Sequence, residues 1–369
     1  MNQSGKTAAI ISLYGNLNFG NKLQNYAVQE VLKSEGIDTT NICNVPCLNN
    51  RQNDIIKVLK FYLIGFIRRM KDGDKIISCI DPNDPRERKQ HFLEFNDRIH
   101  NSKHFFSFRR LKEFDGFDYY FVGSDQIWNP QYGGLSDLDL LIFTSSKKIA
   151  ISASFGTESF DEESISKIEQ YISKFDAISV RESTAKVTIE KYTRRHDVQV
   201  LVDPTMMLSR EEWDKVIKKP SKWKEGRYVT CYFLGTETEE YKNAIKDFAE
   251  RNNCTIVDLS KSSSQLYSSG PSEFVYLIKN ATAVFTDSFH ASAFSIIYNT
   301  PFVVFNRNGK YSKMGSRIDT LLTTFELENA RFSGRISDEI LNRDYSMTNQ
   351  ILKKERDKAL GFVRASLQS

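Results

Sequence analysis

The stretch AAIISLYGNLNFGNKLQNYAVQEVLKSEG, residues 8–36, decides the fold. It begins with a short apolar run, Ala8–Leu13, which is typical of a strand buried on both faces of a parallel sheet. A turn from Gly15 to Gly20 follows, and apolar residues then recur at helical spacing until Gly36 ends the pattern. A strand, a turn at its carboxyl end and a helix make up the repeating unit of an α/β protein.

The same alternation continues along the rest of the chain. Short apolar runs predict further strands at Tyr119–Val122, Ile149–Ala153, Ala177–Val180, Val198–Val202, Tyr228–Leu234, Thr255–Leu259, Ala283–Thr286 and Phe302–Phe305. Helical segments separate most of these runs. We therefore expect an α/β fold with parallel sheets and right-handed crossovers.

Length and composition predict two domains. The chain has 369 residues, 40% of them hydrophobic and 27% charged, which excludes a disordered or low-complexity chain. Domains hold ~100–200 residues, so this length fits two. The lysine-rich, proline-containing stretch 218–224 indicates a linker within 204–226. We expect Rossmann-like domains at 1–205 and 206–345, and a C-terminal helix within 346–369 that could pack back on the first domain.

Composition and motifs exclude several classes of protein. The net charge of +4 is too small to indicate a nucleic-acid partner, and no basic face with stacking aromatic residues is apparent. The sequence contains no G-x-G-x-x-G, P-loop or H-E-x-x-H motif, and its five cysteines form no C-x-x-C pair. We expect no nucleic-acid partner, no metal and no cofactor.

Two features bear on localisation. The first residues lack the pattern of a secretion signal and no stretch of 18 apolar residues occurs, so we expect a cytoplasmic protein. Residues 55–71 are apolar and end in a basic run. Such a segment can lie on an anionic membrane surface, which would make the protein peripheral at the inner face of the membrane. It can equally be a packed helix with outward-pointing basic side chains.

Polar loops follow the strands where ligands bind in parallel sheets. After the first strand, Asn18, Gly20 and Asn21 begin a helix whose N–H groups can bind an anion, although an ordinary turn would look the same. After Tyr119–Val122, the candidates for binding sugar hydroxyls are Asp125, Gln126 and Asn129, with Trp128 to stack on a sugar ring. The alternative is a capped turn, with Ser124 or Asp125 as N-cap and Trp128 in the interdomain core.

Cationic and titratable residues follow three later strands. Arg181 can bind a carboxylate or phosphate, or it can form a surface pair with Glu182. Asp287, Ser288 and His290 follow Ala283–Thr286, and an imidazole there suits proton transfer near neutral pH. The next loop contains Arg307, Lys313, Ser316 and Arg317, which suit a dianion, unless this is only a solvated surface loop.

Taken together, these segments resemble the polysaccharide pyruvyl transferase family. The matching stretches are NFGNKLQNYAVQEVL at 18–32, VGSDQIWNP at 122–130, ISVRES at 178–183, VDPTMM at 202–207, TDSFHA at 286–291 and SRIDTLL at 316–322. The resemblance implies two Rossmann domains arranged as in GT-B glycosyltransferases. It also implies transfer of pyruvate from phosphoenolpyruvate, as co-substrate, to two hydroxyls of one sugar in a cell-surface polysaccharide precursor. That acceptor could be lipid-linked.

The resemblance also assigns roles to residues. Arg181 looks like an arginine that serves the donor, and His290 looks like the histidine of an Arg-x-His element in the family. Ser288 stands where that element has arginine, so Arg307, Lys313 or Arg317 would have to supply the missing charge. The first domain would hold the acceptor and the second the donor.

Three functions follow from these residues. The leading hypothesis is a pyruvyl transferase with His290 as general acid and base. The second is a GT-B glycosyltransferase that uses a nucleotide sugar. The third is a non-catalytic binding subunit of a glycan-assembly complex, which the serine at position 288 keeps open.

Overall fold

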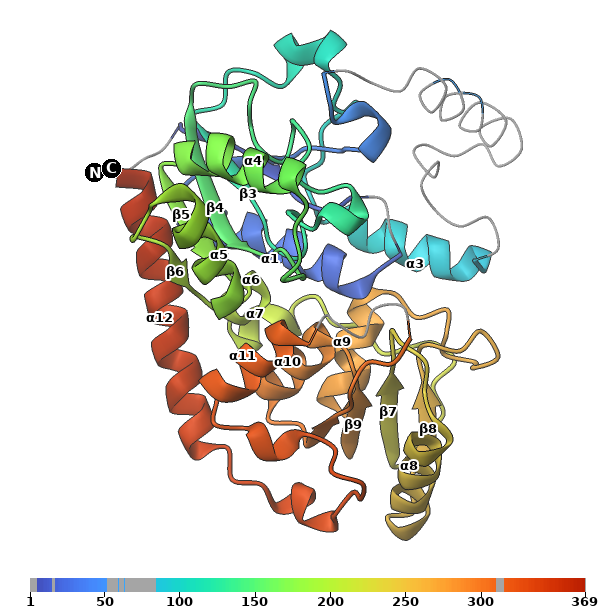
Figure 1. Ribbon diagram of the computed structural model, residues 1–369. Coiled ribbons are helices and arrows are strands. Elements are labelled where there is room, and N and C mark those ends of the chain that lie inside the picture. Colours follow the sequence, from blue (N-terminus) through green and yellow to red (C-terminus); the bar gives the residue numbers. More distant parts are fainter. Residues whose placement is uncertain are drawn as a thin grey trace. The chain divides into compact units, whose positions relative to one another are not determined.

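The computed structural model describes residues 5–14, 17–51, 59, 63, 84–309 and 315–368 (Figure 1). The chain forms two compact units. Unit 1 contains Met1–Asp84, Asn96–Pro204 and Leu360–Ser369, and unit 2 contains Pro85–Phe95 and Thr205–Ala359.

Unit 1 is built on a six-stranded parallel sheet with the order β2-β1-β3-β4-β5-β6. Its strands are β1 (Thr7–Ile11), β2 (Asp38–Asn41), β3 (Tyr119–Val122), β4 (Lys147–Ala153), β5 (Ala177–Val180) and β6 (Gln199–Val200). The central strands are the apolar runs that the sequence predicts. Strand β2 was not predicted, because its residues DTTN are polar and it lies at the edge of the sheet.

Unit 2 is built on a four-stranded parallel sheet with the order β10-β9-β7-β8. Its strands are β7 (Tyr228–Tyr232), β8 (Thr255–Asp258), β9 (Ala283–Thr286) and β10 (Phe302–Val304). The central strands β7 and β9 are buried throughout. Two α/β units with parallel, Rossmann-like sheets are therefore confirmed.

Helices connect the strands in both units. The α-helices are α1 (Phe19–Ser34), α3 (Arg86–Asn96), α4 (Glu162–Tyr171), α5 (Ser183–Thr193), α6 (Pro204–Met207), α7 (Arg210–Asp214), α8 (Glu239–Arg251), α9 (Pro271–Lys279), α10 (Phe289–Tyr298), α11 (Ser316–Thr324) and α12 (Ser346–Gln368). The 3-10 helices are η1 (Pro46–Leu48), η2 (Phe108–Glu113), η3 (Pro130–Tyr132), η4 (Ile172–Lys174), η5 (Glu328–Ala330) and η6 (Asp338–Asn342).

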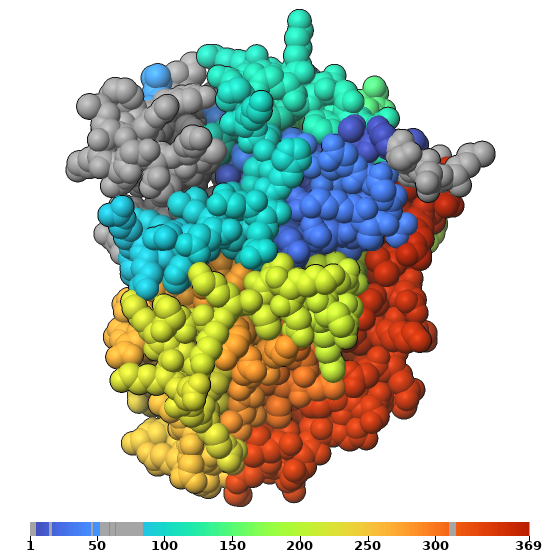
Figure 2. Space-filling model, turned by 180° about the vertical axis from the view of Figure 1, so that it is seen from behind, coloured from blue at the N-terminus to red at the C-terminus, as the bar shows by residue number. Residues whose placement is uncertain are grey.

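Two helices join a unit from a distant part of the sequence. Helix α3 belongs mostly to unit 2, where Lys218 pairs with its Glu94 at 3.2 Å and Lys222 pairs with its Glu87. Figure 2 shows this face, with α3 in cyan beside the yellow-green segment that carries both lysines. The last turns of α12 belong to unit 1, where the Tyr119 hydroxyl donates to the carbonyl of Leu367 at 2.9 Å.

The order of strands reverses once in each sheet, and these reversals position the candidate sites. In unit 1 the reversal falls between β1 and β3, and in unit 2 it falls between β7 and β9. Ligands of open parallel sheets bind outside the carboxyl ends of the strands at such points. The loops after β3 and β9 are the ones that the sequence analysis singled out.

Some predicted features lie outside the described residues. Lys313 is one of them, and of the segment 55–71 only Leu59 and Leu63 are described. The membrane contact predicted for this segment therefore stays a prediction. In the part of the chain that the structure describes, no helix has the length and apolar character needed to cross a membrane.

Candidate functional site

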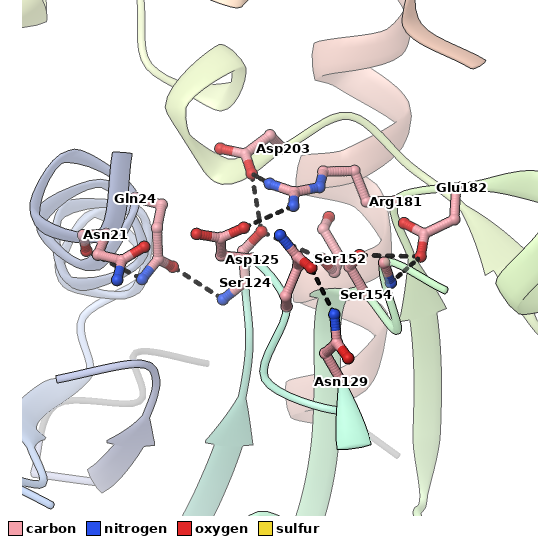
Figure 3. A network of polar contacts seen from close by, with 12 residues as sticks. Asn21, Gln24, Ser124, Asp125, Asn129, Ser152, Ser154, Arg181, Glu182 and Asp203 are labelled. Carbon is pink, nitrogen blue, oxygen red and sulfur yellow. Dashed lines mark hydrogen bonds and ion pairs between the residues drawn. The ribbon is translucent and has the colours of Figure 1, made fainter. Parts of the chain in front are cut away.

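In unit 1, the loop after β3 is tied to helix α1 and to the segment after β6. The backbone N–H of Ser124 donates to Gln24 Oε1 at 2.8 Å, and Gln24 Nε2 donates to the carbonyl of Asn21 at 3.0 Å. The Ser124 hydroxyl donates to Asp203 Oδ2 at 2.8 Å. These contacts fix the loop against its neighbours (Figure 3).

Arg181 lies at the centre of this network, between two carboxylates (Figure 3). Its Nη1 is 2.6 Å from Asp203 Oδ2 and its Nη2 is 2.8 Å from Asp125 Oδ1. Burial opposes the charged guanidinium, but the carboxylates of Asp125, Asp203 and Glu182 outweigh it and raise the pKa of Arg181. Arg181 is therefore a buried cation held by Asp125 and Asp203, and the surface pair with Glu182 considered above is wrong.

Glu182 is buried and has partners of its own. Its Oε1 accepts hydrogen bonds from the Ser154 hydroxyl at 2.8 Å and from the backbone N–H groups of Phe155 and Gly156 at 3.0 and 3.2 Å. Three donors around one oxygen stabilise a carboxylate in a buried place. These three donors therefore stabilise the buried Glu182 carboxylate.

The remaining polar residues of this loop stabilise its turn. Asn129 Nδ2 donates to Gln126 Oε1 at 2.6 Å, and Asn129 Oδ1 accepts from the backbone of Gln131 at the start of η3. Trp128 is fully buried against the rings of Phe155 and Phe175, both with centroids at 5.6 Å. The structure therefore places Trp128 in the core of unit 1 rather than where it could stack on a sugar, and the N-cap of the turn is Asn129 instead of Ser124 or Asp125.

The first predicted loop has the geometry of a helix cap. Asn18 is the N-cap of α1, and its side chain accepts from the backbone N–H of Asn21 at 3.2 Å. Gly20 and Asn21 are buried in the first turn. One N–H group of this helix terminus is thus bound within the protein.

In unit 2, Asp287 connects the carboxyl ends of β9 and β7. Its Oδ1 and Oδ2 accept from the backbone N–H groups of Leu234 and Gly235 at 2.7 and 2.8 Å. Arg307, which follows β10, donates from Nη2 to the Asp287 carbonyl at 2.8 Å. A Cβ at Gly235 would lie 2.7 Å from Arg307 Cγ and 2.9 Å from Asp287 Oδ2, so this close approach requires glycine.

Ser288 and His290 begin helix α10. Ser288 is the N-cap, with a side chain that accepts from the backbone N–H of Ala291 at 3.5 Å. His290 follows two residues later, is 6% exposed, and has its ring edge-on to that of Phe289 at 5.4 Å between centroids. Position 288, where the resembling family has arginine, therefore stabilises the helix start in this chain.

Ser316 and Arg317 begin helix α11, which packs against α10. Arg317 is buried and Ser316 is half-buried. Because α10 and α11 follow β9 and β10, which are adjacent parallel strands, both helices start from the same edge of the sheet. His290 and Arg317 thus share the carboxyl edge of unit 2 with Asp287 and Arg307.

A cavity of about 310 Å³ opens at this edge. It is lined by Asp287, Phe305, Asn306, Arg307, Gly315, Ile318, Asp319 and Arg331. Arg331 pairs with Asp319 and donates to Asn306 Oδ1 at 3.0 Å. Within the described residues, no group of three or more His, Cys, Asp or Glu side chains could hold a metal ion.

Sequence reasoning missed three residues of these two edges. Asp203 directly follows the apolar run 198–202, so the rule that found Arg181 after its strand could have found it. Gln24 and Arg331 carry no such signal. Gln24 lies inside a helix, and Arg331 reaches the edge through an isolated bridge to Val304.

The fold and these two strand edges define a protein of two parallel α/β units with polar groups gathered at the carboxyl ends of both sheets. A family model described as polysaccharide pyruvyl transferase matches residues 18–309. The chain belongs to this family, as its motifs predicted. No curated protein matches the chain in sequence.

Several solved structures are similar to the chain at low identity. The UDP-GlcNAc 2-epimerase of Methanocaldococcus jannaschii, solved with UDP-GlcNAc and UDP, is 12% identical with a TM-score of 0.46, over 99% of this chain and 100% of that one. The UDP-GlcNAc 2-epimerase of Neisseria meningitidis is 9% identical with a TM-score of 0.46, over 98% and 99%. A glycosyltransferase of Streptomyces sp. SF2575 is 11% identical with a TM-score of 0.45, over 98% and 100%.

Proposed function

We propose that this protein transfers a pyruvyl group from phosphoenolpyruvate to two hydroxyls of a sugar in a cell-surface polysaccharide precursor, forming a cyclic ketal. Membership of the polysaccharide pyruvyl transferase family over residues 18–309 is the observation that carries this proposal. Unit 2 would hold the donor and unit 1 the acceptor.

The charges at the carboxyl edge of unit 2 support its role as the donor side. Phosphoenolpyruvate carries a phosphate and a carboxylate, which guanidinium groups and helix N-termini bind well. Arg307 and Arg331 line the cavity together with Asp287 and Asp319, and Arg317 lies in the first turn of α11 at the same edge. The Asp287 carboxylate lies 3.3 Å from Arg307 Nε and also accepts from the backbone N–H groups of Leu234 and Gly235, so it does not depend on the arginine alone.

Arg307 is the best placed substitute for the arginine that position 288 lacks. Its guanidinium contacts the carbonyl of Asp287, the residue next to Ser288. It follows the strand next to β9 and lines the cavity. We assign it to the phosphate or the carboxylate of the donor, with Arg317 as a second cation.

His290 would act as the general acid. A proton added to the methylene carbon of phosphoenolpyruvate gives a methyl group and cationic character at the adjacent carbon. One sugar hydroxyl forms a C–O bond there, and the second hydroxyl forms another as phosphate leaves with the electrons of its own C–O bond. One of the two hydroxyl protons balances the proton used at the methyl group and the other leaves with phosphate. The scheme uses no metal, so a chelator should leave the rate unchanged.

A second candidate function, a non-catalytic phosphometabolite-binding subunit, is favoured by one observation. Ser288 caps a helix where the family's element has a cation. This alternative predicts binding of phosphoenolpyruvate without release of phosphate when a sugar is added.

The test compares donors and measures binding and turnover separately. Calorimetry with phosphoenolpyruvate and with a panel of nucleotide sugars reports which donor binds. Phosphate release is then followed with phosphoenolpyruvate and p-nitrophenyl hexosides. We expect phosphoenolpyruvate to bind and phosphate to appear only with a sugar present. Binding of a nucleotide sugar, with none of phosphoenolpyruvate, would refute the proposal.

A further inference from the structure

We infer that Arg331 binds an anionic group of the donor and that Asp319 is its exchangeable counterion in the free protein. The inference rests on the proposed function and extends the donor site beyond the residues that directly follow β9 and β10. When the donor binds, its phosphate or carboxylate replaces the Asp319 carboxylate beside the Arg331 guanidinium. Asp319 thus tunes the affinity of the site for the donor.

The backbone fixes Arg331 at the carboxyl edge of unit 2. Arg331 forms a parallel bridge with Val304, the last residue of β10, and the N–H of Phe332 donates to the Val304 carbonyl at 2.8 Å. The ring of Phe332 stacks on that of Phe305, with centroids 4.6 Å apart. Arg331 is therefore held beside the end of β10, at the edge where ligands of parallel sheets bind.

The cavity at this edge has the lining and the size for a small anion. The guanidinium-bearing residues Arg307 and Arg331 line it, together with the apolar residues Phe305 and Ile318. Guanidinium groups bind phosphates and carboxylates through paired N–H donors, and apolar side chains suit the methylene group of phosphoenolpyruvate. The volume of about 310 Å³ lies at the lower end of the range for ligand pockets, ~300–1,000 Å³. It therefore favours phosphoenolpyruvate over a nucleotide sugar.

The guanidinium of Arg331 can donate to a ligand in addition to its present partners. Its Nη1 donates to Asn306 Oδ1 at 3.0 Å, and its Nη2 donates to Asp319 Oδ1. These are its side-chain partners within the part of the chain that the structure describes, and a guanidinium has more N–H donors than these two contacts use. Its side chain is 31% exposed. An anion in the cavity can therefore reach it.

The ion pair of Arg331 with Asp319 is one that a ligand can replace. The Asp319 side chain is 60% exposed, and ion pairs of exposed groups add little to stability because water screens them. Asp319 also lies in the first turn of α11, where the positive end of the helix dipole favours a carboxylate. Separation from Arg331 therefore leaves the Asp319 carboxylate both hydrated and next to a favourable dipole.

The charges around the cavity show why Asp319 matters for affinity. Arg307 and Arg331 balance Asp287 and Asp319 in the free protein. Asp287 is held in place by the backbone N–H groups after β7 and is buried, whereas Asp319 is exposed. Asp319 is thus the carboxylate that can turn away, and the lining then carries a net positive charge toward the donor.

The experiment measures the Kd of phosphoenolpyruvate by calorimetry in the full chain and its variants. Arg331→Gln removes the guanidinium, Asp319→Asn removes its counterion, and a double variant removes both. The matched control is Arg251→Gln. Arg251 pairs with Asp338 and is 33% exposed, but it ends α8 and precedes β8, at the opposite edge of the sheet. Thermal melting establishes that each variant is folded.

We expect Arg331→Gln to raise the Kd of phosphoenolpyruvate about tenfold or more, as for a lost hydrogen bond between charged groups. Asp319→Asn should lower the Kd about two- to tenfold, because the donor no longer competes with a carboxylate for Arg331. The double variant should bind like Arg331→Gln, since Asp319 acts through Arg331. Arg251→Gln should stay within twofold of the wild type.

An unchanged Kd in folded Arg331→Gln would overturn the inference. An equal rise in Arg251→Gln would overturn it as well, because net charge would then explain the effect. If Asp319→Asn tightens binding by the same factor with and without Arg331, Asp319 only repels the donor and the exchange is refuted. If the wild-type chain does not bind phosphoenolpyruvate, the proposed function fails and this assignment falls with it. Wild-type binding beside equal binding by Arg331→Gln refutes this assignment alone.

Discussion

The two carboxyl edges place an aspartate at corresponding points and surround it differently. Asp125 follows β3 and is paired with the guanidinium of Arg181, whereas Asp287 follows β9 and accepts from two backbone N–H groups in addition to lying 3.3 Å from Arg307 Nε. In unit 1 the guanidinium of Arg181 pairs with the carboxylates of Asp125 and Asp203, and its side chain is 1% exposed. In unit 2 the side chains of Arg307 and Arg331 are 10% and 31% exposed. The guanidinium of unit 1 is thus buried between two carboxylates, whereas the guanidinium groups of unit 2 pair with aspartates and stay partly exposed.

The largest expected effect tests the edge of unit 2. His290→Asn should fold normally and lose about 10²–10⁴ in turnover, because amide groups do not transfer protons near neutral pH. Phosphate release in the presence of a sugar measures the loss, and calorimetry checks that phosphoenolpyruvate still binds. An unchanged rate would remove the imidazole from the mechanism and with it the catalytic role of this edge.

The second prediction contrasts the two arginines as structural elements. Arg181→Gln leaves two buried carboxylates without their cation and should cost about 3–5 kcal/mol of unfolding free energy. Arg307→Gln should cost less, since backbone N–H groups still bind Asp287. Urea denaturation measures both. Equal costs would show that the two edges do not differ in the way described.

The third prediction concerns Asp139, a buried carboxyl of unit 1. Among the described residues it forms no ion pair. Burial raises its pKa to about 7, against hydrogen bonds from Ser136 that act to lower it. The folded state therefore holds this proton more tightly than the unfolded state does. Its contribution to stability is complete below the pKa of the unfolded chain, near 3.8, and is lost as the pH rises through about 7.

The size of this effect follows from the shift. At ~1.4 kcal/mol per pKa unit, stability should fall by up to ~4 kcal/mol between pH 4 and 7. Urea denaturation across this range measures the slope, and Asp139→Asn should flatten it. If stability falls with pH in Asp139→Asn as steeply as in the wild type, another group is responsible for the titration.

The smallest expected effect on stability and binding concerns Gly235, which lies against Arg307 at the edge of unit 2. Alanine there would bring its Cβ within 2.7 Å of Arg307 Cγ and of the Asn308 carbonyl, so the Arg307 side chain or the loop must move. We expect a loss of about 1–3 kcal/mol in stability and a severalfold weaker binding of phosphoenolpyruvate. Denaturation and calorimetry measure the two. Wild-type binding in this variant would show that the donor does not depend on the position of Arg307.

Sequence patterns predicted the fold well and the contacts of the site only in part. Buried parallel strands must be apolar, so their runs and the polar loops after them are visible in the sequence. The polar edge strand β2 was missed for the same reason. Which partner a polar side chain takes is decided by packing between distant segments, so the sequence could not show that Arg181 is bound by Asp203. Position 288 was treated in the sequence analysis as the place of a missing arginine, so Ser288 was not predicted to be the N-cap of α10.

The most direct test of the central claim is analysis of the reaction product. The wild-type chain is incubated with phosphoenolpyruvate and a p-nitrophenyl hexoside, and the product is analysed by mass spectrometry and, from a parallel reaction in deuterated water, by proton NMR. The account predicts a sugar heavier by one pyruvate less one water, a ketal methyl group that carries one deuterium, and one phosphate released per product. A sugar extended by a second sugar from a nucleotide donor, with phosphoenolpyruvate left intact, would contradict it.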